Sequence, residues 1–182
     1  MPPSSSAVQT ASVRLWLLRH AKSSWDDDDL ADEDRPLAPR GERAADAMRA
    51  YLETNDIAPA LVLCSSALRA RQTLARVLPG LGRDLEVRIE PGLYTFDAGV
   101  LIERLRRVPT GVASVMVVGH NPALQDLAVR VTDRGDRLED LVQKFPPGAL
   151  AEIEVGPGSW ETFAEPRRLL TRFVAPRELR VT

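Results

Sequence analysis

The sequence is poor in cysteine and has no long hydrophobic run, and each shortage excludes a class of protein. Its single cysteine, Cys64, rules out an internal disulfide and a multi-cysteine zinc site. Cys64 ends an apolar run, which predicts a buried, inert thiol rather than a catalytic one. No segment approaches the ~20 apolar residues of a membrane span. The N-terminus carries no charged leader or apolar stretch, so a cytoplasmic protein without a signal peptide is expected.

The chain also lacks an excess of charge of either sign. It has 24 Lys and Arg against 26 Asp and Glu, a net charge of −2. Broad nucleic-acid binding needs a basic surface, so we expect neither nucleic acid nor membrane as a partner. With 182 residues, 44% of them hydrophobic, the chain can bury one full core. We expect a disordered tail over residues 1–12 and a single domain over residues 13–182; the oligomeric state stays open.

Short apolar segments alternate with amphipathic ones along the chain. The alternation predicts an α/β fold, a three-layer α/β/α sandwich around a mostly parallel sheet. Ser65 or Ser66 is expected to cap the second helix, and Asn121 and Pro122 to begin the fourth. Residues 133–136 are expected to form a loop. Strands are predicted at residues 13–18, 61–64, 86–89, 114–118, 149–155 and, antiparallel to the last of these, 168–174; helices are predicted at 39–55, from 65 or 66 to 78, 98–108 and 122–132.

The two histidines of the chain each follow a predicted buried strand. His20 comes just after residues 13–18, and His120 just after residues 114–118. In a parallel sheet, ligands bind beyond the carboxyl ends of the strands. Residues 65–69 also follow a strand, so three distant segments are expected to meet at one edge of the sheet.

These segments carry the groups that phosphoryl transfer requires. A phosphoryl group has charge on three peripheral oxygens and needs several cations and donors in fixed positions. Arg19 supplies a guanidinium beside His20, and Arg69 lies near a helix start, where an anion is favoured. His120 precedes another helix start. His20 is then free to attack phosphorus, because a neutral imidazole is a good nucleophile at pH 7.

Several motifs also resemble one known family. LRHAKS (residues 18–23) is similar to the arginine-histidine signature of the histidine phosphatase superfamily, also called phosphoglycerate mutase-like. SSALRARQT (65–73) resembles its second motif and GHNP (119–122) its third. DRPL (34–37), followed by RG (40–41), resembles the SixA-type branch, the phosphohistidine phosphatases. Together and in order, these motifs cover nearly the whole chain and are highly specific.

The resemblance implies a catalytic cycle without a cofactor or metal. His20 would become transiently phosphorylated, and water would then release phosphate. Arg19, Arg69 and His120 would hold the phosphoryl oxygens, with Ser23 as a weaker contact. The chain departs from the family twice: alanine replaces a common glycine after His20, and serine replaces the usual proline at position 66.

The resemblance gives no clear proton donor. Members that cleave phosphoesters use an acidic side chain, often a glutamate after the third strand, and Glu90 and Asp97 are the weak candidates in that region. The SixA-type branch is thought to lack this acid. A phosphorylated imidazole can take a proton on its other nitrogen and leave without help, whereas an alkoxide cannot. A missing acid therefore favours phosphohistidine on a signalling or phosphotransfer protein as the substrate.

Other interpretations remain open. Within enzymes, the runner-up is a small-molecule phosphomonoesterase acting on sugar or nucleotide phosphates; outside them, it is a non-catalytic phosphate-binding regulator. Two structural histidines, or a zinc or manganese site with carboxylates of the acidic loop (residues 26–34), compete as well, although the histidines lack the close spacing of metal-ligand pairs. That loop is expected to be solvated or to guide a basic partner. Trp25 and Tyr94 are candidates to line the mouth of the site.

Overall fold

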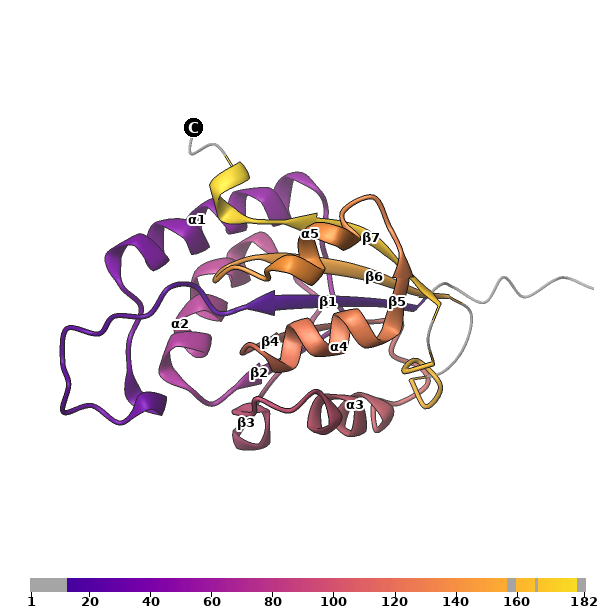
Figure 1. Cartoon of the computed structure of the whole chain (residues 1–182), viewed down its shortest axis with the longest axis horizontal. Coiled ribbons are helices and arrows are strands. Elements are labelled where there is room, and N and C mark those ends of the chain that lie inside the picture. Colours follow the sequence, from indigo (N-terminus) through magenta and orange to yellow (C-terminus); the bar gives the residue numbers. More distant parts are fainter. Residues whose placement is uncertain (1–12, 157–159, 166, 180–182) are drawn as a thin grey trace, which may run out of the picture.

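A seven-stranded sheet lies between two layers of helices (Figure 1). The computed structural model describes residues 13–156, 160–165 and 167–179, so the predicted tail over residues 1–12 lies outside it. One hydrophobic cluster joins the sheet to α1 and α2, and a second joins its other face to α3, α4 and α5. Among the described residues, no helix combines the length and apolar character needed to cross a membrane.

The elements follow one another in the predicted alternation. Strand order in the sheet is β3-β2-β4-β1-β6-β7-β5, with β1 to β4 mutually parallel where they pair and β6 antiparallel to both β1 and β7. The strands are β1 (Val13–Arg19), β2 (Leu61–Ser65), β3 (Glu86–Glu90), β4 (Ser114–Gly119), β5 (Thr132–Arg134), β6 (Leu150–Gly156) and β7 (Arg168–Val174); the helices are α1 (Pro39–Thr54), α2 (Leu68–Val77), α3 (Ala98–Arg106), α4 (Ala123–Val131) and α5 (Leu138–Gln143), with short 3-10 helices η1 (Asp32–Asp34), η2 (Leu78–Gly80), η3 (Pro91–Leu93) and η4 (Pro176–Glu178). The predicted α/β/α sandwich is confirmed.

Strand β1 is buried on both faces, which explains its unbroken apolar sequence. Leu15 and Leu17 belong to the cluster beneath α3, α4 and α5. Trp16 and Leu18 point the other way, into the cluster beneath α1 and α2. A central strand covered by helices on both sides needs apolar residues at successive positions, not at alternate ones.

The carboxyl ends of three central strands lie side by side. The parallel register pairs Arg19 of β1 with Gly119 of β4, and Cys64 of β2 with Val118 of β4. The residues that follow these pairs therefore emerge at one edge of the sheet. The sequence predicted this edge as the place where the distant segments meet.

Both predicted helix caps are wrong. Helix α2 begins only at Leu68, after the N-cap residue Ala67, and no side chain caps it. Ser65 instead contacts a histidine ring, and Ser66 donates to Glu33. Tertiary partners therefore take both hydroxyls, and local capping propensity does not decide the helix start.

The same error affects the fourth helix. The structure begins α4 at Ala123 with Pro122 as the N-cap residue, and again no side chain caps it. The Asn121 amide donates instead to Gln125 and to the Phe145 carbonyl. Asn121 thus ties this turn to a distant loop.

Two short elements were not predicted: β5 overlaps the start of the loop expected at residues 133–136, and α5 follows that loop. Thr132 and Arg134 of β5 pair in parallel with the beginning of β7, and the six-residue α5 follows shortly afterwards. Neither element is long enough to show a periodic pattern. Both exist because β7 and α4 offer surfaces for them, which a local reading of the sequence could not show.

Candidate active site

The loop after β1 is held by close packing against α1 and α2. The Ala38 N–H donates to the Lys22 carbonyl at 2.8 Å, and the Ala21 N–H donates to the Thr73 hydroxyl at 3.0 Å. Gly41 packs against this loop, and a Cβ at that position would overlap the Lys22 carbonyl oxygen. The SSALRARQT motif, through Thr73, and the RG motif, through Gly41, therefore fix the backbone that follows His20.

His20 lies directly beyond β1 with 8% of its surface exposed. Its Nδ1 lies 2.7 Å from the Ala21 carbonyl oxygen. A carbonyl can only accept, so Nδ1 carries the proton and Nε2 keeps its lone pair. Burial lowers the pKa of His20 to about 3; the hydrogen bond to Ala21 opposes this shift, and the nearby His120, Arg69 and Arg19 add smaller contributions in the same direction as burial. The ring is therefore neutral and nucleophilic at pH 7.

His120 faces His20, with a distance of 5.0 Å between the ring centroids. Its Nε2 lies 2.7 Å from the Ser65 hydroxyl. Its Nδ1 is buried and has no hydrogen-bond partner in the described part of the chain. Burial, reinforced by Arg69 and Arg19, lowers the pKa of His120 to about 4 although Asp32 opposes the shift. Two neutral imidazoles thus stand together.

Arg19 is held by one of its nitrogens. The guanidinium donates from Nη1 to the Phe145 carbonyl at 2.6 Å. Its Nε is buried and has no partner among the described residues. Burial lowers the pKa of Arg19 from its usual value. One donor of a buried cation therefore remains free for an anion.

Arg69, in the first turn of α2, is paired with an aspartate of the acidic loop. It donates to the Asp32 carboxylate at 2.8 Å and also to the Asp32 carbonyl. The same carboxylate accepts from Tyr94 at 2.5 Å and from Arg35 at 3.0 Å. These contacts, Tyr94 first, lower the pKa of Asp32 to about 2. Asp32 is therefore exposed to solvent, as expected for this loop, and is also hydrogen bonded to residues around His20.

Arg35 is a pocket residue that the sequence analysis missed. Its guanidinium is buried and donates to the Ser23 hydroxyl at 3.0 Å, to the Asp32 carboxylate and to the Ser24 carbonyl. Trp25 stacks on it, with 3.1 Å from the guanidinium carbon to the ring centroid. The signal was present in the DRPL motif (residues 34–37), whose arginine is Arg35 itself.

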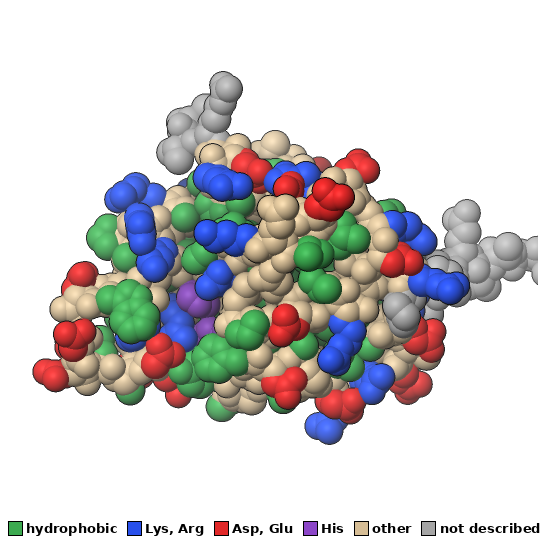
Figure 2. All heavy atoms as spheres, viewed as in Figure 1, with side chains coloured by type: hydrophobic (Ala, Val, Ile, Leu, Met, Phe, Trp, Pro, Cys, Tyr) green, Lys and Arg blue, Asp and Glu red, His purple; other side chains and the backbone are tan. Residues whose placement is uncertain are grey.

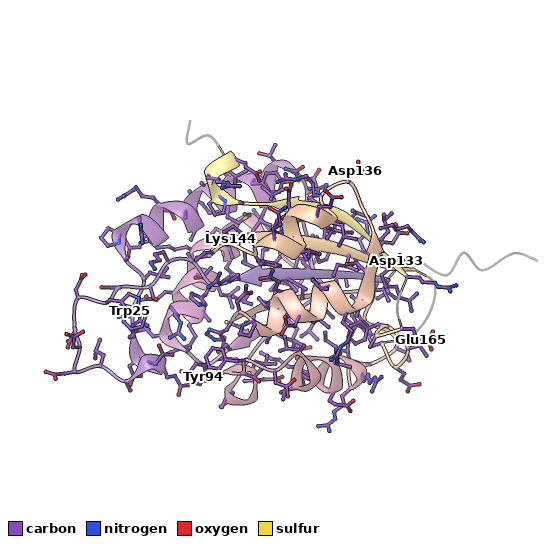
Figure 3. All side chains as sticks on the ribbon, viewed as in Figure 1. Trp25, Tyr94, Asp133, Asp136, Lys144 and Glu165 are labelled. Atoms are coloured by element: carbon purple, nitrogen blue, oxygen red, sulfur yellow. The ribbon has the colours of Figure 1, made fainter. Side chains whose placement is uncertain are left out.

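These side chains surround one open pocket of about 230 Å³. Figure 2 shows histidine atoms at the bottom of a hollow, with basic and hydrophobic side chains around it. Trp25 and Tyr94 lie at this end of the molecule, far from Asp133 and Glu165 (Figure 3). The lining residues include Arg19, His20, Ser23, Trp25, Asp32, Arg35, Arg69, Phe96 and Asn121. The predicted convergence of the three segments is confirmed; the roles of the individual residues stay predictions.

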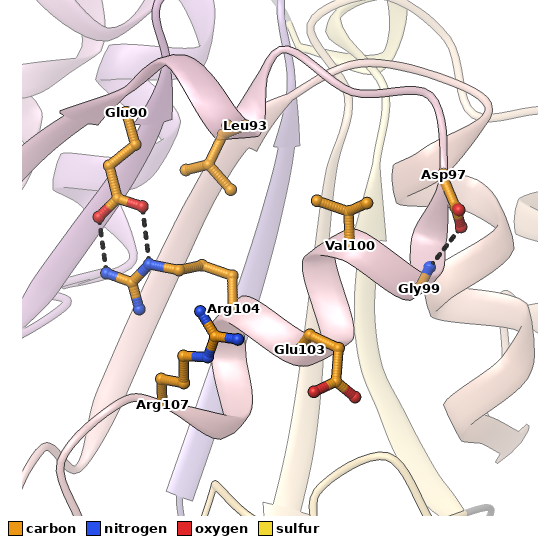
Figure 4. A pocket seen from close by; sticks show the side chains of 9 residues that line it. Glu90, Leu93, Asp97, Gly99, Val100, Glu103, Arg104 and Arg107 are labelled. Atoms are coloured by element: carbon orange, nitrogen blue, oxygen red, sulfur yellow. Dashed lines mark hydrogen bonds and ion pairs between the residues drawn. The ribbon is translucent and has the colours of Figure 1, made fainter.

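The weak candidates for a general acid lie elsewhere. Glu90 receives two hydrogen bonds from Arg104, at 2.6 and 2.7 Å, and this pairing lowers its pKa. Asp97 caps α3 by accepting from the Gly99 N–H at 2.7 Å. Both line a separate pocket (Figure 4) and neither lines the pocket of His20. An aspartate directly before a predicted helix is a local signal for such a cap, whereas the local sequence of Glu90 gave no sign of Arg104.

Two further predictions concern metals and the thiol. The described ranges contain no group of three or more His, Cys, Asp or Glu side chains arranged to hold a metal ion. Cys64 is fully buried, and burial raises its pKa to about 12. The predicted inert thiol is confirmed.

Comparisons with known proteins agree with the motifs. The profile of the histidine phosphatase superfamily (branch 1) matches residues 15–108. A protein of Mycobacterium tuberculosis is 38% identical over 164 residues, which are 88% of this chain and all of that protein. A chloroplastic protein of Arabidopsis thaliana is 32% identical, over 82% of this chain and 75% of its own.

Solved structures indicate the branch of the superfamily to which the chain belongs. SixA from Nakamurella multipartitia, provisionally described as a phosphohistidine phosphatase, has a TM-score of 0.75 and 30% identity over 91% of this chain and 96% of its own. SixA from Agrobacterium tumefaciens, described in the same provisional way, has a TM-score of 0.75 and 28% identity over 90% and 98%. The chain therefore belongs to the histidine phosphatase superfamily, and within it to the SixA-like branch.

Proposed function

We propose that this phosphatase removes the phosphoryl group from phosphohistidine on another protein, with His20 as the nucleophile and without a metal. The observation that carries the proposal is the pair of neutral imidazoles 5.0 Å apart, with Arg19 and Arg69 beside them. His20 offers the lone pair of Nε2. Among the described residues, Arg19 Nε and His120 Nδ1 are buried without partners, as expected of donors that bind phosphoryl oxygens.

The two steps balance without an acid from the enzyme. Nε2 of His20 attacks phosphorus, and the P–N bond of a substrate imidazole protonated on its other nitrogen breaks. The electron pair stays on the leaving nitrogen, so the substrate ring becomes neutral while phosphorylated His20, which keeps its Nδ1 proton, becomes cationic. Water then attacks phosphorus, His20 leaves as a neutral imidazole, and the water proton goes to phosphate or solvent.

His120 and the arginines would act on the phosphoryl oxygens. With the Ser65 hydroxyl donating to Nε2 of His120, the ring proton sits on Nδ1, which can then donate to an oxygen. Arg19 contributes its free Nε. Arg69 and Arg35 share Asp32 with Tyr94, so an incoming phosphoryl group would compete with, or bind beside, that carboxylate.

The charged groups of the pocket favour a P–N bond over a phosphoester. An alkoxide leaving group needs a proton, and the carboxylate in the pocket, Asp32, has a pKa of about 2 and is ionised at neutral pH. Glu90 and Asp97 are outside it. The volume of about 230 Å³ is below the ~300–1,000 Å³ of typical small-ligand pockets, so most of the substrate would stay outside.

The test compares substrates and traps the intermediate. We expect a higher kcat/KM for a phosphohistidine protein and for phosphoramidate than for sugar, nucleotide or alkyl phosphates. A quenched reaction should contain acid-labile phosphate on the wild-type protein and none on His20→Asn. Preference for phosphomonoesters would make the enzyme a small-molecule phosphatase. Phosphate binding without label or turnover would make it a regulator.

A further inference from the structure

Two large aromatic side chains are exposed at the mouth of the His20 pocket. Trp25 has 66% and Phe96 51% of its surface exposed, and both line that pocket. Burying such rings is normally favourable, and they dominate the energetics of binding sites. The hydrophobic atoms beside the histidines in Figure 2 mark the same end of the molecule.

Both rings are held in place by contacts with other side chains. One face of Trp25 lies on the Arg35 guanidinium, which is itself buried and hydrogen bonded. Phe96 lies edge-on to Tyr94 and His120, with centroid distances of 5.7 and 5.9 Å. The supported rings need little further ordering to bind a partner, which lowers the entropic cost of binding.

The pocket between them has a negative group as well as cations. The Asp32 carboxylate lines the pocket and is partly exposed, with 46% of its side chain accessible. Arg19, Lys22, Arg35 and Arg69 also line the pocket, and Asp32 is paired with two of them, so the pocket would select a leaving group by its flat aromatic shape and not by positive charge. An imidazole bearing the phosphoryl group has this shape, whereas ammonia and an alkyl alcohol do not.

We propose that Trp25 and Phe96 form a leaving-group subsite, which binds the imidazole ring of the substrate while its phosphoryl group faces His20. This inference rests on the proposed function and names the part of the substrate that the pocket selects. Stacking on these rings orients the imidazole, whose P–N bond then breaks with the electron pair remaining on the ring nitrogen. The rings are therefore determinants of specificity, and the phosphoryl ligands are different residues.

The test uses two small substrates that share a phosphoryl group and differ in the leaving group. N-phosphorylimidazole carries the ring, and phosphoramidate carries only an amine. We expect Trp25→Ala and Phe96→Ala each to lower kcat/KM for N-phosphorylimidazole about 3- to 10-fold more than kcat/KM for phosphoramidate. Trp25→Tyr, which keeps a ring, should restore most of this selectivity.

The control is Val129→Ala, which removes an exposed apolar side chain on α4 outside the pocket. It should leave both substrates unchanged. Equal losses for the two substrates in the aromatic variants would overturn the subsite. So would a loss confined to a phosphohistidine protein, since the rings would then contact the surface of that protein. Wild-type turnover of alkyl phosphates but of neither P–N compound would overturn the proposed function itself, and the subsite with it.

Discussion

The larger of two neighbouring pockets is not the one with the chemistry. The pocket over α3 has about 440 Å³ and that of His20 about 230 Å³. In the larger one, Glu90 is paired with Arg104 through two hydrogen bonds, and Asp97 caps its own helix (Figure 4). In the smaller one, a buried nitrogen of Arg19 has no partner among the described residues, and neither has Nδ1 of His120, whose ring lies beside His20.

The comparison shows that unsatisfied polar groups identify a site better than volume does. A buried donor without a partner costs free energy, typically ~1–3 kcal/mol, so a protein retains one only where something compensates. Paired charges, as in Glu90 and Arg104, need no ligand. The four predictions below test this contrast, from the largest expected effect to the smallest.

Replacing the nucleophile should abolish turnover, whereas replacing the paired carboxylate should not. We expect His20→Asn to lower kcat by about 10³-fold or more, because no other group near phosphorus offers a lone pair. Glu90→Gln should leave kcat within about twofold. Steady-state kinetics with phosphoramidate measure both. A large loss in Glu90→Gln would make the α3 pocket part of the catalytic site.

Substitution of Arg69 should lower activity far more than substitution of Arg104, although each arginine is paired with a carboxylate. Arg69→Lys keeps a charge but loses the fork that contacts Asp32 and, as proposed, the phosphoryl group. We expect kcat/KM to fall about 10- to 100-fold. Arg104→Lys, the matched change in the other pocket, should have little effect on activity. Comparable losses in the two variants would remove the distinction between the pockets.

The buried histidines should make stability depend on pH. Their pKa values of about 3 (His20) and about 4 (His120) lie below the value of about 6.5 expected in the unfolded chain. Below that value the unfolded state binds more protons, so the free energy of unfolding falls as the pH decreases. Between pH 7 and 5 the loss is on the order of 1–2 kcal/mol for each histidine.

Urea titrations at the two pH values measure this loss. His120→Asn should show a smaller decrease in the free energy of unfolding between pH 7 and pH 5 than the wild type. Glu90→Gln should keep most of the wild-type difference, because Arg104 holds the pKa of that carboxyl below its usual value and the group stays ionised in the folded protein at both pH values. An unchanged difference in His120→Asn would show that this ring is not buried in neutral form.

The smallest effect is expected at Ser65. Ser65→Ala removes the hydroxyl beside Nε2 of His120, so the ring is no longer held in one tautomer. We expect kcat/KM to fall about 3- to 10-fold, with a changed pH profile as the sign of a positioning role. Ser66→Ala is the control, since Ser66 donates to Glu33 instead. Equal effects of the two changes would point to a general disturbance of the β2–α2 turn.

Much of the fold and the site was predictable from the sequence because the signals are local. The apolar runs of β1, β2 and β4 indicated strands buried on both faces, and parallel strands bring their carboxyl ends together. This was enough to place His20, Arg69 and His120 at one edge. It was not enough for Arg35, which folds back on Ser23 within the same loop, or for Asp32, which also meets the distant Arg69 and Tyr94.

The sequence by itself determined which segments are central strands and which reactive groups follow them, because burial on both faces imposes a pattern within a few residues. Only the tertiary structure decided how those groups are paired. Asp32 meets Arg69 and Tyr94 across 37 and 62 residues, and Glu90 meets Arg104 rather than the pocket. Such pairings depend on the geometry of packed loops and helices, and neighbouring residues along the chain carry no record of them.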